Sequence, residues 1–331
     1  MKKVFLSALS IALFGMVFFL GTTIFPVYRA IALVVQKDVE QLTQESDSGI
    51  VDKTCPEPIE GIQSPLYEHR IEWAHSEDGV HFQSDGHVLL EHASVPDGVL
   101  RDDGEIWVYY VNGVPGQHAI FVARLEGEEL VPLECIRLDG EVVGDAVDPD
   151  IVSLPEGGYR LFYFLGWFTP ENRPPPGGAP HPMYSAVSAD GVHFEVEQVQ
   201  LTLEKEGTDP TVVCLPSGRW LMAVTVKERV VLAATDTGDD FALTDHEFPS
   251  GISELAYFPE AQVVRLFISG PQTTVWESAD EGKTWEEIPM VKIPGPDPSV
   301  VSDGEDGWIM FYKSFTRDPV REKPGSFSVS P

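Results

Sequence analysis

Between residues 67 and 316 the chain is built from short runs in which apolar and polar residues alternate, separated by turns rich in glycine. Alternation with a period of two is typical of half-buried β-strands, and such frequent turns disfavour long helices. One unit recurs along this region: a turn, a β-branched strand, a glycine turn and an aromatic-rich strand. Its copies open at five places, Val95, Asp148, Asp209, Ser253 and Asp297. Repetition of one supersecondary unit predicts a repeat architecture.

A second unit alternates with the first and consists of a strand, a tight acidic turn and another strand. Residues 278–285 form a full Asp-box, S-x-D-x-G-x-T-W, of the kind found in sialidases. Shorter versions occupy residues 76–82 and 188–194, and weaker copies occupy 124–130 and 235–241. In such a turn the aspartate can accept backbone N–H bonds while glycine takes a positive φ. We therefore interpret these turns as structural, with the closing aromatic side chain packed between sheets.

Five copies of each unit predict an all-β fold, a five-bladed β-propeller with four strands in each blade. The order of the units is permuted. The acidic hairpin at 71–82 comes before any opening unit, and the opening unit at 297–312 has no acidic hairpin after it. We expect the N-terminal hairpin to complete the last blade, so that the ring closes and leaves no long sheet edge open. A β-sandwich would not need this ending.

The N-terminus predicts export. Lys2 and Lys3 precede an uncharged run over residues 4–25, long enough for a transmembrane helix, which needs ~20 residues, and the domain after it is acidic. This pattern predicts one N-terminal transmembrane helix that anchors the domain outside the cytoplasm. The alternative is a secreted protein, with a signal peptide cleaved near residues 30–32, Ala-Ile-Ala. The predicted divisions are an anchor or signal segment (1–35), a polar linker (36–66), the propeller (67–316) and a tail (317–331).

Composition narrows the functional classes. The chain has 53 acidic and 22 basic residues, a formal charge of −31, and no basic stripe, which excludes nucleic-acid binding. An acidic surface is typical of soluble domains, and an acidic cleft for sugars or cations is the functional alternative. The three cysteines include no CxxC pair, so two could form a disulfide or all three could be buried thiols. The histidines lack metal-ligand spacing, and we expect a monomer with no cofactor and no metal.

The repeats resemble the five-bladed propeller glycosidases, the clan of arabinanases, β-xylosidases, invertases and levansucrases that includes glycoside hydrolase family 43. The resemblance covers residues 67–316 and is carried by Asp-Pro-x-[Ile/Val]-Val openings at Asp148, Asp209 and Asp297, each followed by a glycine turn and an aromatic strand. Sialidases share the Asp-box but have six blades. The resemblance implies a triad of carboxylates around the propeller axis in the chain order Asp, Asp, Glu.

Asp148, Asp209 and Glu254 stand at three successive blade openings in that order. The first strand of each blade is innermost, so its opening residues converge at one mouth of the central channel. Converging carboxylates cannot all ionise freely, which raises one pKa and leaves a proton to donate. The resemblance then implies Glu254 as general acid, Asp148 as base or nucleophile and Asp209 as the group that holds the sugar or tunes Glu254.

Some residues depart from the family pattern. The first blade opens with Val95-Pro96-Asp97, and Glu254 lacks the Gly-Pro that usually follows the acid. Asp before Pro is also a common turn starter, so the Asp-Pro openings could be turn chemistry alone. We expect further carboxylates and the long insertion at 167–178 to contact substrate, although a plain surface loop is an equal alternative for the insertion. These predicted substrate-binding residues are Asp97, Asp150, Asp297, Trp167 and Arg173.

Two functions remain open at this point. One is an extracytoplasmic glycoside hydrolase that acts on oligo- or polysaccharide through carboxylates at the channel mouth. The other is a non-catalytic propeller that binds a glycan or a protein partner at the cell envelope. Fold does not choose between them, so whether the chain is an enzyme depends on the geometry of its carboxylates.

Overall fold

The computed structural model describes residues 55–56, 64–166, 181–204, 207–271 and 273–316. The chain divides into two units, 1–54 and 55–331, and all of the described residues belong to the second. Within the described residues no helix is long and apolar enough to cross a membrane. The predicted anchor therefore lies outside the described residues, as do the predicted tail and most of the predicted linker.

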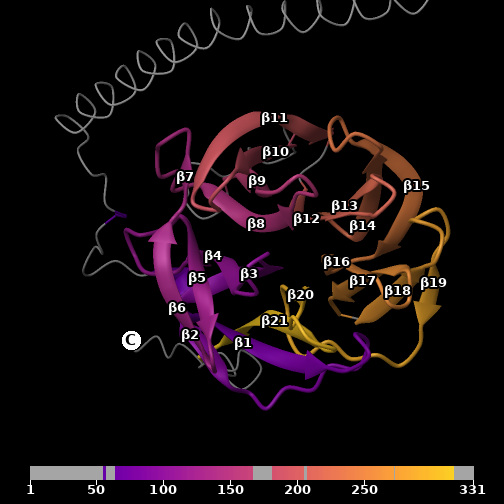
Figure 1. Ribbon diagram of the computed structural model, residues 1–331, viewed down its shortest axis with the longest axis horizontal. Helices are drawn as coiled ribbons and strands as arrows, with labels where there is room; N and C mark the ends of the chain where they lie inside the picture. The colour runs from indigo at the N-terminus through magenta and orange to yellow at the C-terminus, as the bar shows by residue number, and fades with distance from the viewer. Residues whose placement is uncertain (1–54, 57–63, 167–180, 205–206, 272, 317–331) are drawn as a thin grey trace, which may run out of the picture. The chain divides into compact units, whose positions relative to one another are not determined.

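The described residues form five sheets, antiparallel except for one short rim strand, which are arranged as blades around a central axis with no α-helix among them (Figure 1). This confirms the all-β, five-bladed propeller. Each blade begins with a strand at the axis and ends with a strand at the rim. The innermost strands are β3 (Ala93–Leu100), β8 (Ala146–Ser153), β12 (Thr208–Cys214), β16 (Ile252–Phe258) and β20 (Ser299–Ser302).

The first four blades are continuous in sequence. The second strands, which carry the aromatic residues, are β4 (Ile106–Asn112), β9 (Tyr159–Leu165), β13 (Trp220–Val226) and β17 (Val263–Ser269). The outer pairs are β5 (Ile120–Glu126) with β6 (Glu129–Cys135), β10 (His181–Ser188) with β11 (His193–Leu203), β14 (Arg229–Thr235) with β15 (Ala242–Pro249), and β18 (Thr274–Ser278) with β19 (Glu286–Ile288). A two-residue strand, β7 (Arg137–Leu138), adds to the rim of the second blade by pairing in parallel with β11.

The fifth blade joins the two ends of the propeller. After a short 3₁₀ turn (Pro65–Glu68), β1 (His69–Ser76) pairs with β21 (Trp308–Phe315) along its whole length, from His69 opposite Phe315 to Ser76 opposite Trp308. The strand β2 (Val88–Glu91) forms the rim, and the blade order is β2-β1-β21-β20. The N-terminal hairpin therefore completes the last blade, as the permuted repeat predicts. It pairs with β21 directly and with β20 only through β21.

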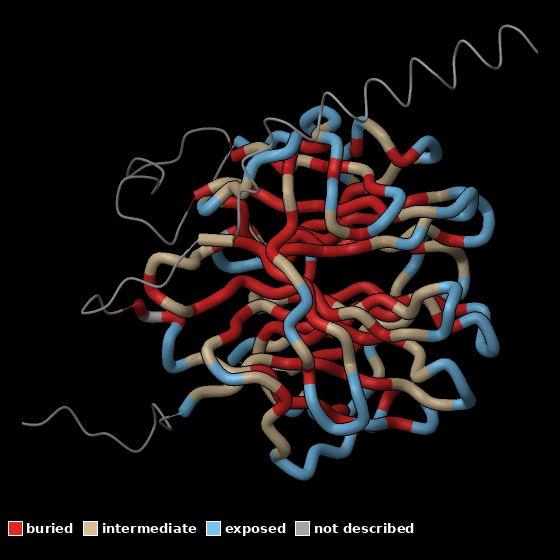
Figure 2. The backbone as a smooth tube through the Cα atoms, turned by 60° about the vertical axis from the view of Figure 1, so that its left-hand side comes forward, coloured by how far each residue is buried: buried red, intermediate tan, exposed pale blue. Residues whose placement is uncertain are grey.

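The core lies between neighbouring blades, where aromatic side chains of one sheet pack on the next. Phe162 of the second blade meets Phe241 of the third edge to face, with ring centroids 6.0 Å apart. The ring centroid of Phe258 in the fourth blade lies 4.2 Å from that of Trp308 in the fifth. Buried backbone runs through the interior strands and exposed backbone is confined mainly to turns (Figure 2).

The acidic turns adopt the hydrogen bonding expected from their sequence and also join blades. Asp280 accepts from the backbone N–H of Thr284 at 2.8 Å, and Gly282 has a φ of 79°. The carbonyls of three such turns accept a hydrogen bond from an arginine of the preceding blade. These bonds are Arg160 to Gly238 at 2.7 Å, Arg219 to Glu281 at 3.1 Å and Arg265 to Asp78 at 2.9 Å. The turns therefore have a structural role at the rim.

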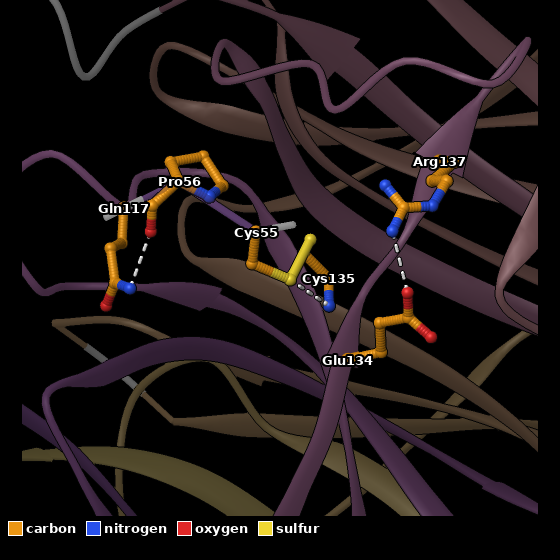
Figure 3. Close-up of a disulfide and its surroundings, with 6 residues drawn as sticks. All are labelled: Cys55, Pro56, Gln117, Glu134, Cys135 and Arg137. Atoms are coloured by element: carbon orange, nitrogen blue, oxygen red, sulfur yellow. Dashed lines mark hydrogen bonds and ion pairs between the residues drawn. A yellow bond between two sulfur atoms is a disulfide. The ribbon is translucent and has the colours of Figure 1, made fainter. Parts of the chain in front are cut away.

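A disulfide joins Cys55 to Cys135, which ends β6 in the first blade (Figure 3). Beside it, the Gln117 amide donates to the carbonyl of Pro56 at 2.6 Å. The remaining cysteine, Cys214, is a free thiol. Sequence alone left the pairing open; the cross-link closes a loop with a sequence separation of 80 and holds the chain before the propeller against the first blade.

Candidate functional site

Four of the five innermost strands open with the same distorted backbone. Val95, Asp148, Asp209 and Asp297 have φ values of 50°, 48°, 51° and 52°, and each is followed by proline. Non-glycine residues rarely adopt a positive φ, and in β3, β8 and β12 the ladder register shifts at this point, which marks a bulge. Because the same strained backbone recurs at equivalent positions of four blades, it belongs to the design of the propeller mouth and marks a candidate functional site. We call these first residues, with Ile252 of the fourth blade, the mouth positions.

The opening residues of all five strands surround one small cavity on the axis, with a volume of about 30 Å³. It is lined by the three opening residues of the first four blades and the first two of the fifth: Val95 to Asp97, Asp148 to Asp150, Asp209 to Thr211, Ile252 to Glu254, and Asp297 with Pro298. Six carboxyl groups therefore converge there, and all six are residues that the sequence nominates. They divide into two layers.

The first layer contains the acids of the mouth positions. The Oδ2 atom of Asp148 accepts the backbone N–H of Asp209 at 3.3 Å, and the two carboxyl groups are also in hydrogen-bond contact. Burial, together with the charges of Asp209 and Asp297, raises the pKa of Asp148 well above its usual range. Burial and the charge of Asp297 raise the pKa of Asp209 to about 6. Two adjacent carboxyl groups of this kind share a proton at neutral pH.

The third acid of this layer has a cationic partner. Lys313, on β21, makes an ion pair with Oδ2 of Asp297, and both side chains are largely buried. Burial lowers the pKa of Lys313, but the charges of Asp297, Asp209 and Asp148 outweigh it and raise that pKa overall. His69 lies close by; burial and then the charge of Lys313 lower its pKa to about 4, so it is neutral at neutral pH.

The second layer occupies the third residue of each opening and forms a closed cycle of hydrogen bonds, which we call the inner ring. In each blade this side chain accepts a hydrogen bond from a backbone N–H of the next blade. The donor is the residue that directly follows the third opening residue there. The five bonds are Ile151 to Asp97 (2.5 Å), Val212 to Asp150 (3.0 Å), Leu255 to Thr211 (2.9 Å), Val300 to Glu254 (2.8 Å) and Gly98 to Ser299 (2.9 Å). The cycle returns to its starting blade, so the inner ring joins all five blades at the axis.

Burial dominates the acid–base properties of the inner ring. It raises the pKa of Asp97 to about 7 and those of Asp150 and Glu254 well above their usual range. The carboxylate oxygens of these three residues lie within 4.8 Å of one another. Carboxylate oxygens are ligands that Mg²⁺ and Ca²⁺ prefer, so these are the described residues that could hold a divalent cation.

The structure brings the predicted catalytic acids to one cavity but not to one layer. Asp148 and Asp209 occupy mouth positions together with Asp297. Glu254 belongs to the inner ring with Asp97 and Asp150, and both of its oxygens are used, by the N–H of Val300 and by the hydroxyl of Thr211. Trp167 and Arg173 lie outside the described residues.

Three features of the site escape sequence reasoning. One is the ion pair between Lys313 and Asp297, which no local pattern in the sequence indicates. The roles of Thr211 and Ser299 in the inner ring are also missed, because a hydroxyl at a blade opening attracts no attention beside an aspartate. Aligning the blades on the proline that follows each mouth position would have shown Asp97, Asp150, Thr211 and Ser299 to be equivalent.

No protein-family model matches the sequence, and no curated protein matches it at a significant level. Solved structures do match. A family 117 glycoside hydrolase, Zg3597 from Zobellia galactanivorans, is 14% identical over 78% of this chain and 94% of that chain, with a TM-score of 0.51. A putative exo-beta-1,3-galactanase from Bifidobacterium bifidum s17 is 14% identical over 71% and 94%, with a TM-score of 0.48.

The GH43_1 enzyme from Xanthomonas citri, solved with xylotriose, is 15% identical over 65% of this chain and 84% of that chain, with a TM-score of 0.44. At such identities the likeness concerns the fold. This chain has the five-bladed propeller fold seen in glycoside hydrolases, and the resemblance drawn from the repeats is confirmed at that level.

Proposed function

We propose that the propeller is a glycoside hydrolase that cleaves oligo- or polysaccharide at the channel mouth, with Asp148 and Asp209 as its proton-donating pair. Glycosidic hydrolysis needs a carboxylic acid that stays protonated near neutral pH to protonate the leaving oxygen. The fold shared with glycoside hydrolases supports the proposal, but fold alone does not establish an activity.

One observation carries the proposal: two buried carboxyl groups from neighbouring blades touch each other at strained mouth positions. Burial and the charges of Asp209 and Asp297 raise the pKa of Asp148, whereas burial and the charge of Asp297 bring that of Asp209 to about 6. A shared proton of this kind is a recurring device for keeping an acid available at neutral pH. The inner-ring acids are less suited to donate, because their oxygens already accept hydrogen bonds that join blades.

The test is a hydrolysis screen of the full chain on aryl glycosides and on plant and bacterial polysaccharides. The matched control is the double variant Asp148→Asn/Asp209→Asn, which keeps the shape of both side chains. We expect the wild-type chain to release reducing sugar from at least one substrate and the control to release far less. Equal release by both proteins, or none by either, would contradict the proposal.

We also propose that the domain acts outside the cytoplasm, held to the membrane by residues 1–35. The uncharged run after Lys2 and Lys3 supports this. The disulfide between Cys55 and Cys135 adds independent support, since disulfides persist mainly in oxidising compartments. A reporter fused after Pro331 should report an extracytoplasmic position, and a cytoplasmic signal would contradict it. A mature chain beginning at Leu33 would instead favour secretion after cleavage.

The second candidate function is a non-catalytic propeller that binds a glycan or a protein at the cell envelope. One observation favours it: the mouth positions of the first and fourth blades are apolar, Val95 and Ile252, so the mouth has fewer acids than the blades could supply. The two candidates differ in a simple assay. A binding propeller would be retained by an immobilised glycan without shortening it. Wild type and the Asp148→Asn/Asp209→Asn variant would then both show no hydrolysis.

A further inference from the structure

The acids of the mouth positions are distributed unevenly around the channel. Neighbouring innermost strands follow the order β3, β8, β12, β16, β20 and back to β3, and β20 lies across the centre from β8 and β12 (Figure 1). The mouth positions in that order are Val95, Asp148, Asp209, Ile252 and Asp297. Asp148 and Asp209 are therefore adjacent, whereas Asp297 stands opposite them with an apolar residue on each side.

Asp297 also differs from the pair in its partners. Its Oδ2 atom forms the ion pair with Lys313, and its Oδ1 atom has no hydrogen-bond partner among the described residues although the residue is only 3% exposed. The ion pair on one oxygen leaves the other oxygen of this carboxyl group as an available acceptor. Burying a polar atom without a hydrogen-bond partner costs free energy. Such an atom is therefore expected to accept a hydrogen bond from a water or a ligand.

The cavity between these acids is the size of water rather than of a sugar. Its volume is about 30 Å³, enough for one or two waters, since a water needs roughly 10–15 Å³ of such space. A sugar ring must therefore stay above the mouth, while a water can occupy the cavity and reach Oδ1 of Asp297. Asp148 and Asp209 therefore differ from Asp297 in position, since a water in the cavity can reach Oδ1 of Asp297 from below the sugar.

We propose that Asp297, held by Lys313 across the channel from Asp148 and Asp209, is the general base that activates water for attack on the anomeric carbon. The proposal rests on the proposed hydrolase function and extends it to a residue of the fifth blade. Lys313 is a positioning residue, which fixes the carboxylate and leaves Oδ1 directed to the water.

Oδ1 of Asp297 takes a proton from the water as the water oxygen forms its bond to the anomeric carbon. The bond between that carbon and the glycosidic oxygen breaks, and its electron pair leaves with the oxygen, which receives the proton shared by Asp148 and Asp209. One water is consumed, Asp297 ends protonated, the pair ends one proton poorer, and proton exchange with solvent restores both.

Leaving-group dependence tests the role directly on the full chain. The base acts on water whatever the leaving group is, so Asp297→Ala should slow good and poor aryl leaving groups alike, by about 10²–10⁴. Asp148→Asn should slow mainly the poor ones. Azide should restore turnover to Asp297→Ala and yield a glycosyl azide, because azide attacks without needing a base. The matched control is Asp306→Ala, an exposed aspartate of the same blade, which should behave as wild type.

Three results would overturn the proposal: an Asp297→Ala rate within about threefold of wild type, a loss confined to poor leaving groups, or a covalent glycosyl ester on Asp297. Lys313→Met tests the positioning role through kcat and KM measured separately. Without the ammonium that fixes the Asp297 carboxylate, kcat should fall while KM stays within about threefold, and Lys313→Arg, which keeps a cation, should restore part of the loss. Equal kcat in Lys313→Met and wild type would contradict that role.

A second readout separates this proposal from the hydrolase function. Infrared difference spectra at neutral pH should show the loss of a protonated carboxyl band on Asp148→Asn, whereas Asp297→Asn, a variant that keeps the side-chain shape, should keep the band of the Asp148–Asp209 pair. Loss of that band on Asp297→Asn would contradict the separate roles of the pair and of Asp297, whether or not any substrate is known. A wild-type chain that cleaves no glycoside would instead overturn the hydrolase function and, with it, the catalytic role of Asp297.

Discussion

The two layers of acids at the axis show how position decides what one residue type does. Asp148 and Asp150 lie two residues apart on the same strand, both buried and both with raised pKa values. Asp150 belongs to the inner ring and accepts the N–H of Val212 in the next blade. Asp148, on the strained bulge, instead meets another carboxyl group. Backbone distortion at the mouth therefore separates acids suited to chemistry from acids that join blades.

The largest effect should come from opening the ring on which both layers depend. Deletion of residues 67–83 removes β1, the partner of β21 along its whole length, and leaves the fifth blade incomplete. We expect loss of the cooperative unfolding transition in thermal melts monitored by circular dichroism. A truncated chain that melts like the full chain would show that neither layer needs a closed propeller.

The mouth should respond to substitution chiefly in its activity. In Asp209→Asn the charge that helps raise the pKa of Asp148 is gone, so Asp148 should lose its proton at a lower pH. We expect kcat/KM at neutral pH to fall by about 10²-fold and the basic limb of the pH profile to move to lower pH. The melting temperature should change little. An unchanged limb would mean that the two groups do not titrate as a pair.

The inner ring should respond in stability. Glu254→Ala leaves the N–H of Val300 and the hydroxyl of Thr211 without their acceptor, and each such loss costs about 1–3 kcal/mol. We expect urea denaturation to show a decrease of about 2–4 kcal/mol in the free energy of unfolding. Glu254→Gln keeps an amide oxygen in place and is the matched control, with a smaller decrease. Equal stability of Glu254→Ala and wild type would remove the structural role of the ring.

A smaller effect is expected in the pH dependence of stability. Burial raises the pKa of Asp97 to about 7, so between about pH 4 and 7 the folded state keeps a proton that the unfolded state has lost. Stability should therefore fall as pH rises through this window and level off above it. Asp97→Asn removes this contribution and should flatten the slope of unfolding free energy against pH. Identical slopes for the two proteins would contradict the assignment.

Much of the fold could be predicted from the sequence because its signals are local and repeated. The alternating strands, the glycine turns and the permuted order of the two units predict five blades and the closing hairpin. The short strand β7 could not be predicted, because Arg137 and Leu138 pair with residues more than fifty positions away and carry no local pattern.

The sequence predicts which acids line the cavity, but not how they divide between the mouth positions and the inner ring. All six acids at the cavity stand out in the sequence, yet Glu254 follows Ile252-Ser253 where other blades have an Asp-Pro or Val-Pro pair. Without the proline, only the strand register assigns Glu254 to the third position, opposite Phe267, as Asp150 is opposite Phe162. The contact between Asp297 and Lys313 depends on side-chain packing across two strands, which no local pattern encodes.

The most direct test of the division between mouth and inner ring compares Asp148→Asn with Glu254→Gln on one glycoside with a poor leaving group. Both substitutions replace a buried acid by an amide of the same shape, so a difference between them reports position rather than chemistry. We predict that kcat/KM falls by about 10²–10⁴ in Asp148→Asn and by less than about tenfold in Glu254→Gln. The reverse result, with Glu254→Gln inactive and Asp148→Asn near wild type, would contradict the account.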